Sequence, residues 1–164
     1  MTAVLPVRRP TQLIDDALNE IRDVWHDESN AWLDRINELV STRDPNVIQP
    51  LLCIWPFEEN DDYHHWMFAV AHAVESYPLD VLAPELAGAI PAVNDVSSYF
   101  LEFLLGRWLN SPNDFGTLLD NLVLLPPDQQ QLVSGILGTL AANRTNNEIA
   151  QANWQTAKSH LTVA

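Results

Sequence analysis

The segment from residue 58 to residue 76 is the richest in side chains that could do chemistry. His72 and Glu75 are three residues apart and His65 precedes His72 by two helical turns, so a helix would place all three on one face. Two turns separate His65 from His72 by about 10 Å, which is too far for one metal ion to bridge. A two-metal site would need ligands on other helices, and the sequence contains no Glu-x-x-His pattern to supply them. We therefore predict no metal site, and we expect His72 to be buried and satisfied by hydrogen bonds.

The sequence also lacks the patterns of nucleophilic catalysis and of phosphate binding. Its single cysteine, Cys53, lies in the apolar run Leu51–Trp55, whereas a reactive thiolate needs a base and an electropositive setting. No serine stands in a Gly-x-Ser-x-Gly elbow, because Ser134 falls within a helical pattern. The five glycines are dispersed and form no phosphate-binding loop. We expect no enzyme activity and no cofactor, and we expect Cys53 to act as a small buried hydrophobic residue.

Two charged residues stand in otherwise apolar helical patterns. One is Glu75, and the other is Arg107, the only basic residue between Pro45 and Asn143, where twelve acids lie. A charge in such a setting is costly unless it is paired. We therefore predict a structural polar cluster of His72, Glu75 and Arg107 between two helices, with a direct role at a partner surface as the alternative.

The elements that must position these residues are helical. Apolar residues recur at helical spacing, and no alternating run bounded by turns predicts a strand. Cap residues and prolines mark the expected helix starts: Thr11, Asp44-Pro45, Asp62, Asp95, Ser111-Pro112 and Pro126-Pro127. The expected helices cover residues 13–25, 32–40, 47–54, 63–77, 79–90, 96–109, 115–124, 127–140 and 146–159. Pro84 is expected to break or restart the helix over residues 79–90, and Pro91 to end it.

These elements predict an all-α fold. We expect a single domain over residues 1–164, in which eight or nine short helices stack as helical hairpins. An irregular, HEAT-like α-solenoid packs in this way. A compact orthogonal helical bundle is the alternative, because no strict repeat is visible in the sequence.

Charge is the strongest feature of the composition. The chain has 22 acidic residues against eight basic ones, which gives a formal net charge of −14. Such a field repels nucleic acid and anionic lipid and attracts basic proteins, although acidity also serves solubility alone. No run is long enough to cross a membrane, and the apolar stretch over residues 3–7 is too short for a signal peptide. We expect a cytoplasmic monomer that binds neither nucleic acid nor membrane.

Two stretches of the sequence form a recognisable pattern. The first is Tyr63-x-x-Trp66-Met67-Phe68-x-Val70-x-His72-Ala73-Val74-Glu75-Ser76-Tyr77, and the second is Arg107-Trp108-Leu109-Asn110-Ser111. The region of about residues 51–124 that holds them resembles immunity family thirty, whose members are small helical proteins that protect bacteria against polymorphic toxins. Trp66 and Trp108 depart from the pattern, since smaller aliphatic residues are expected there. The resemblance implies an intracellular antitoxin that binds one cognate toxin and stops it acting.

The expected partner is the C-terminal toxin domain of a contact-dependent growth inhibition or related system. A nuclease toxin must be basic to hold nucleic acid, so an acidic protein would be steered to it. We expect the contact at an acidic loop and its flanking aromatic residues: Trp55, Phe57, Glu58, Glu59, Asp61, Asp62, Tyr63 and Trp66. For Trp66, core packing is an equal alternative.

A second function also fits the composition. The chain could be a helical-repeat adaptor or scaffold that binds a peptide or a helix of a basic host protein. Gene context separates the two functions, because an immunity gene lies directly downstream of a large toxin gene and an adaptor gene has no such neighbour.

Overall fold

The computed structural model describes residue 5 and residues 11–24, 31–54 and 63–161, with Tyr63 and His64 described by their backbone alone. In these ranges the chain forms nine α-helices and one 3-10 helix, and no strand. This arrangement confirms the predicted all-α class. The chain divides into two compact units, residues 7–89 and residues 90–164.

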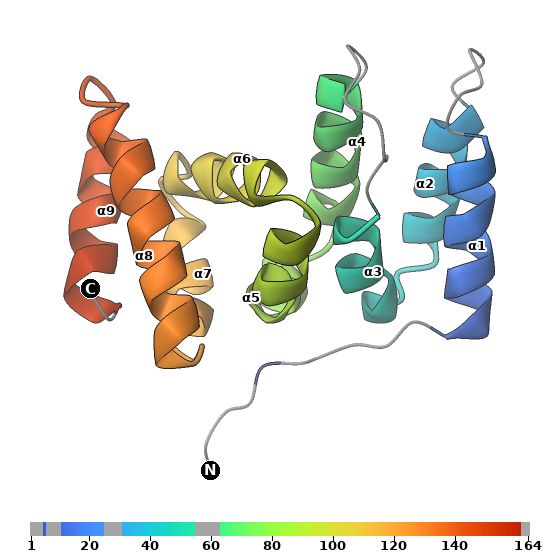
Figure 1. Ribbon diagram of the computed structural model, residues 1–164, viewed down its shortest axis with the longest axis horizontal. Helices are drawn as coiled ribbons and strands as arrows, with labels where there is room; N and C mark the ends of the chain where they lie inside the picture. The colour runs from blue at the N-terminus through green and yellow to red at the C-terminus, as the bar shows by residue number, and fades with distance from the viewer. Residues whose placement is uncertain (1–4, 6–10, 25–30, 55–62, 162–164) are drawn as a thin grey trace. The chain divides into compact units, whose positions relative to one another are not determined.

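The unit of residues 7–89 is built from short helices around an apolar core. Its elements are α1 (Gln12–Asp23), α2 (Ala31–Ser41), the 3-10 helix η1 (Pro45–Val47), α3 (Ile48–Leu52), α4 (Tyr63–Glu75) and the first part of α5 (Leu79–Val96). Helices α1 and α2 lie side by side and antiparallel (Figure 1), and α4 packs on both α2 and α3. The largest core side chains are at most 1% exposed: Ile21, Ile36, Ile48, Leu51, Leu52, Ile54, Trp66 and Met67. Burial of each such side chain stabilises the fold by about 1.5–3 kcal/mol.

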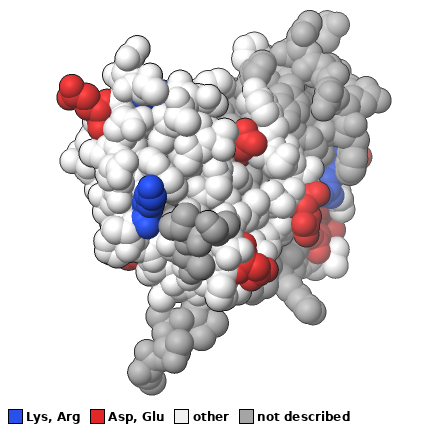
Figure 2. All heavy atoms as spheres, turned by 60° about the vertical axis from the view of Figure 1, so that its left-hand side comes forward, with Lys and Arg blue, Asp and Glu red and all other residues white. Residues whose placement is uncertain are grey.

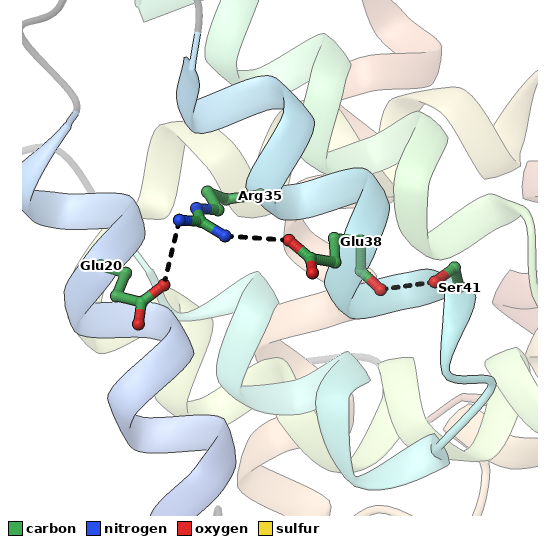
Figure 3. Close-up of polar contacts among 4 residues, drawn as sticks. All are labelled: Glu20, Arg35, Glu38 and Ser41. Carbon is green, nitrogen blue, oxygen red and sulfur yellow. Dashed lines mark hydrogen bonds and ion pairs between the residues drawn. The ribbon is translucent and has the colours of Figure 1, made fainter.

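A polar contact also links the first two helices at their surface. Figure 3 shows Arg35 of α2 reaching Glu20 of α1 at 3.7 Å and Glu38 of its own helix at 3.0 Å. The Ser41 hydroxyl donates to the backbone carbonyl of Glu38 at 2.6 Å. Exposed ion pairs contribute only about 0–1 kcal/mol each, so apolar packing holds this hairpin together.

Two of the predicted helix starts are confirmed at the level of single hydrogen bonds. The Thr11 hydroxyl accepts a bond from the backbone N–H of Ile14 and caps α1. The Asp44 carboxylate accepts a bond from the N–H of Asn46 at 2.9 Å, and Pro45 takes the first position of η1. Both patterns are local, so the sequence alone was sufficient to find them.

Two other predicted starts lie at neighbouring residues. Helix α5 continues past Asp95, and the Ser97 hydroxyl caps α6 by accepting a bond from the next turn at 3.1 Å. Ser111 lies three residues before Asp114, the N-cap of α7, and donates to its carboxylate at 2.8 Å. Several cap-forming residues compete at each of these junctions, and tertiary packing decides among them.

The predicted break at Pro84 and the predicted end at Pro91 are wrong, because α5 runs through both prolines. A proline inside a helix removes a backbone hydrogen bond and crowds the preceding turn, at a cost of about 3 kcal/mol. Leu82, Leu86 and Ile90 of the same helix are 3%, 2% and 0% exposed. Their burial, at about 1.5–3 kcal/mol each, is of the same size as the cost of the two prolines and offsets it.

The unit of residues 90–164 has its own core. After the end of α5 it contains α6 (Ser98–Leu109), α7 (Phe115–Leu122), α8 (Pro127–Ala142) and α9 (Glu148–His160). Helices α8 and α9 lie side by side and antiparallel (Figure 1), and α6 packs on both. A Cβ atom at Gly138 would lie 3.1 Å from the indole of Trp154, so this glycine allows α8 and α9 to approach closely. Among the helices in the described ranges, none has the length and apolar character needed to span a membrane.

Candidate partner-binding surface

Most of the predicted contact residues lie outside the described residues, namely Trp55, Phe57, Glu58, Glu59, Asp61 and Asp62. Tyr63 begins α4, and its side chain is not among the described atoms. The contact of these residues with a partner therefore stays a prediction.

Trp66 packs in the core. It is 1% exposed, and its ring centroid lies 5.4 Å from that of Trp32 on α2, with the rings tilted by 53°. Aromatic pairs in tilted geometry stabilise protein interiors. The prediction that Trp66 anchors a partner is not supported, and the alternative of core packing describes its position.

The other face of α4 carries His65, Phe68, His72 and Glu75 at spacings of three and four residues, and we call these four residues the α4 stripe. His65 is exposed, Phe68 is 45% exposed and the His72 side chain is 66% exposed. The predicted burial of His72 is therefore wrong. Nearly every residue from 66 to 74 is apolar, so hydrophobic spacing does not identify the buried face of this helix.

Three side chains of the α4 stripe, those of Phe68, His72 and Glu75, contact one another in sequence order. The rings of Phe68 and His72 stack with centroids 6.3 Å apart and an angle of 27°. The Nδ1 atom of His72 lies 3.5 Å from a carboxylate oxygen of Glu75, whose side chain is 28% exposed. The stripe thus presents an aromatic ring, an imidazole and a carboxylate along one exposed helix face.

The end of the first sequence stretch has a structural role. Arg43 follows α2 with a left-handed φ of 58°, a conformation that is uncommon outside glycine. Its guanidinium donates to the carbonyl of Ser76 at 2.7 Å and lies 5.8 Å from the ring centroid of Tyr77. The Tyr77 hydroxyl in turn donates to the carbonyl of Asp44 at 3.0 Å. These contacts fasten the end of α4 to the turn after α2.

The second sequence stretch, residues 107–111, is also held by hydrogen bonds. The amide of Asn153 on α9 donates to the carbonyls of Leu109 and Ser111, both at 2.9 Å. Asn147 donates to the side-chain oxygen of Asn110 at 2.9 Å. These bonds satisfy polar groups at the C-terminal end of α6, where carbonyls have no partner within the helix.

The predicted partner of Glu75 lies in the other unit. The guanidinium of Arg107 lies 5.7 Å from the ring centroid of Phe103, one turn earlier on α6. Glu75 belongs to residues 7–89 and Arg107 to residues 90–164. The ion pair between them stays a prediction, while the contact of His72 with Glu75 is present.

Glu85 is a buried acid that sequence reasoning missed. It is 2% exposed and accepts a hydrogen bond at 2.9 Å from the amide of Gln49, which is 6% exposed. A buried carboxylate that accepts a hydrogen bond from a neighbouring helix fits a structural role. Its position in the apolar run of residues 81–90 was the available sign of burial.

Cys53 is only partly buried, whereas the sequence predicted a buried residue. Burial raises the pKa of this thiol from 9.0 to about 11, so it stays protonated at neutral pH. In the part of the chain that the structure describes, no three histidine, cysteine or acidic side chains are grouped to hold a metal ion.

The acidic residues are unevenly distributed between the two units. Residues 7–89 hold 16 acidic and five basic residues, whereas residues 90–164 hold six and three. Exposed carboxylates on α1 and α2 include Asp16, Glu20, Asp23, Asp34 and Glu38. The face shown in Figure 2 is mostly uncharged, with only scattered charged groups. The unit that carries the α4 stripe thus holds most of the acidic residues of the sequence.

Comparison with known proteins identifies the chain. The family of immunity protein 30 matches residues 21–118, which is more than half of the sequence. The chain belongs to this family. No curated protein and no solved structure matches the chain.

The matched region of this immunity protein begins within α1 and ends within α7. It therefore extends further toward the N-terminus than the resemblance seen from residue 51, and it takes in all of α2. The hairpin of α1 and α2 was not part of the predicted contact region.

Proposed function

We propose that this immunity protein binds and neutralises a basic, nuclease-type toxin domain of a contact-dependent growth inhibition or related system. Family membership supports an immunity role against a toxin. The preference for a basic toxin rests on one observation, the concentration of 16 acidic residues against five basic ones in residues 7–89.

The proposed mechanism is binding without catalysis. Carboxylates exposed on one unit attract a basic domain and speed its association, because opposite fields steer the two proteins together. Arg35 pairs with both Glu20 and Glu38, but one cation cannot offset two carboxylates, so it reduces this field only in part. A few desolvated contacts then slow dissociation. Bound in this way, the immunity protein holds the toxin inactive in the cytoplasm of the cell that makes both.

Co-expression with the toxin fragment encoded directly upstream tests this proposal. We expect the tagged immunity protein to co-elute with that fragment, and we expect stoichiometric addition to abolish its cleavage of nucleic acid. A toxin fragment from an unrelated system serves as the control and should not co-elute. Absence of a complex with the cognate fragment would contradict the immunity function. A complex with an acidic fragment that cleaves no nucleic acid would contradict the basic nuclease part alone.

A further inference from the structure

The α4 stripe combines exposure with an ordered arrangement. Phe68 is 45% exposed although the opposite face of α4 is fully used in the core, where Trp66, Met67 and Val70 are at most 1% exposed. Nearly half of the Phe68 side chain is thus open to a partner, on the helix face opposite to the core residues. An exposed aromatic ring that contacts an imidazole, beside a carboxylate, is an arrangement that a partner can use.

The chemistry of the α4 stripe suits a planar cation. The face of an aromatic ring attracts a guanidinium group, and a carboxylate pairs with it through charge-assisted hydrogen bonds. Arginine satisfies both demands because its guanidinium is flat, permanently charged and able to stack. The same chain places its own Arg43 and Arg107 against the rings of Tyr77 and Phe103, at 5.8 and 5.7 Å.

Charge complementarity indicates that the guanidinium group comes from a basic protein. The stripe belongs to residues 7–89, the unit with 16 acidic and five basic residues. A basic protein drawn to this unit brings arginine side chains to its surface at high local concentration. A neutral apolar partner would gain nothing from Glu75 and would have to desolvate it.

We propose that the α4 stripe binds an arginine side chain of the toxin, with the guanidinium stacked on Phe68 and His72 and paired with Glu75. This inference rests on the proposed function in one respect, namely that the partner is a basic toxin. It assigns the exposed face of α4 as a contact surface and arginine as the group that it recognises.

Two conservative substitutions test the proposal. Phe68→Leu keeps an apolar side chain but removes the ring, and Glu75→Gln keeps the shape but removes the charge. We expect each to raise the Kd for the cognate toxin fragment about tenfold, mainly through faster dissociation. The double variant should lose less than the product of the two effects, because both residues act on one guanidinium. Thermal melting of the free variants checks that the fold is unchanged.

The chain offers matched controls on α6. Tyr99 is 49% exposed and Glu102 is exposed, so Tyr99→Leu and Glu102→Gln repeat the same chemical changes elsewhere. Both should stay within about twofold of the wild-type Kd, as residues outside a contact do. If Phe68→Leu and Glu75→Gln bind the toxin as tightly as wild type, the proposal is wrong. Weakening by Phe68→Ala but not by Phe68→Leu would indicate a simple apolar contact and would also overturn it. Failure of the wild-type protein to bind any toxin fragment would instead reject the proposed function.

Discussion

At the scale of single residues, burial of Cys53 links stability to alkaline pH. Because the folded protein holds the thiol proton up to a pKa of about 11 and the unfolded chain releases it near 9.0, the folded state binds more protons between these values. Stability should therefore fall as the pH rises from 9 to 11. Cys53→Ala should make this decline shallower when the free energy of unfolding is measured by denaturant titration at pH 8 and pH 10.

Some alkaline sensitivity should persist in the Cys53→Ala variant. Burial and the carboxylate of Asp44 raise the pKa of the Tyr77 hydroxyl, while Arg43 lowers it, and the net direction is upward. The test therefore compares how steeply the free energy of unfolding falls with pH in the wild-type protein and in the Cys53→Ala variant. Equal slopes would contradict the role assigned to Cys53.

Single residues also show where sequence reasoning failed. The position of Thr11 at a helix start depends on residues within one turn, so the sequence predicted its hydrogen bond to Ile14. The positions of Trp66 and His72 depend on which face of α4 meets α2 and α3. That choice is tertiary, and the apolar residues from 66 to 74 lie on several sides of α4, so the shared face of His65, His72 and Glu75 was the only sign of the exposed side in the sequence.

At the scale of elements, Asn153 should contribute to the attachment of α9 to the end of α6. Asn153→Ala removes two hydrogen bonds to backbone carbonyls in a partly buried site, so we expect a loss of about 1–3 kcal/mol. The loss should occur although alanine is the better helix former. Gln155→Ala, at an exposed position on the same helix, is the control and should be neutral in thermal melting. Equal melting temperatures for the two variants would show that the bonds are not important for stability.

The elements were predicted more reliably than their ends. Helices over residues 63–77 and 127–140 were expected, and α4 and α8 occupy those regions. Errors arose where a local rule competed with burial, as at Pro84 and Pro91. A proline removes one backbone hydrogen bond, whereas the apolar face of α5 buries several side chains. The sequence alone does not show how deeply those side chains are buried, so it does not show which of the two effects is larger.

At the scale of the whole molecule, the uneven charge makes a prediction about the rate of toxin binding. Glu58, Glu59, Asp61 and Asp62 belong to the acidic unit and directly precede α4. Changing these four residues together to glutamine or asparagine should slow association with the toxin at low salt. The rate should converge on that of wild type as salt rises, because screening removes the same attraction at a distance of about 10 Å in 0.1 M salt.

A second variant with four neutralised acids separates local charge from net charge. Asp95, Glu102, Asp120 and Asp128 are exposed acids of residues 90–164, and their amide variant changes the total charge by the same amount. If attraction is local to the acidic unit, this control should associate nearly as fast as wild type in stopped-flow measurements. Equal slowing of the two variants would mean that only total charge matters. If the variant of residues 90–164 associates more slowly than the variant of Glu58, Glu59, Asp61 and Asp62, the toxin binds residues 90–164. The proposed contact surface on residues 7–89 would then be wrong.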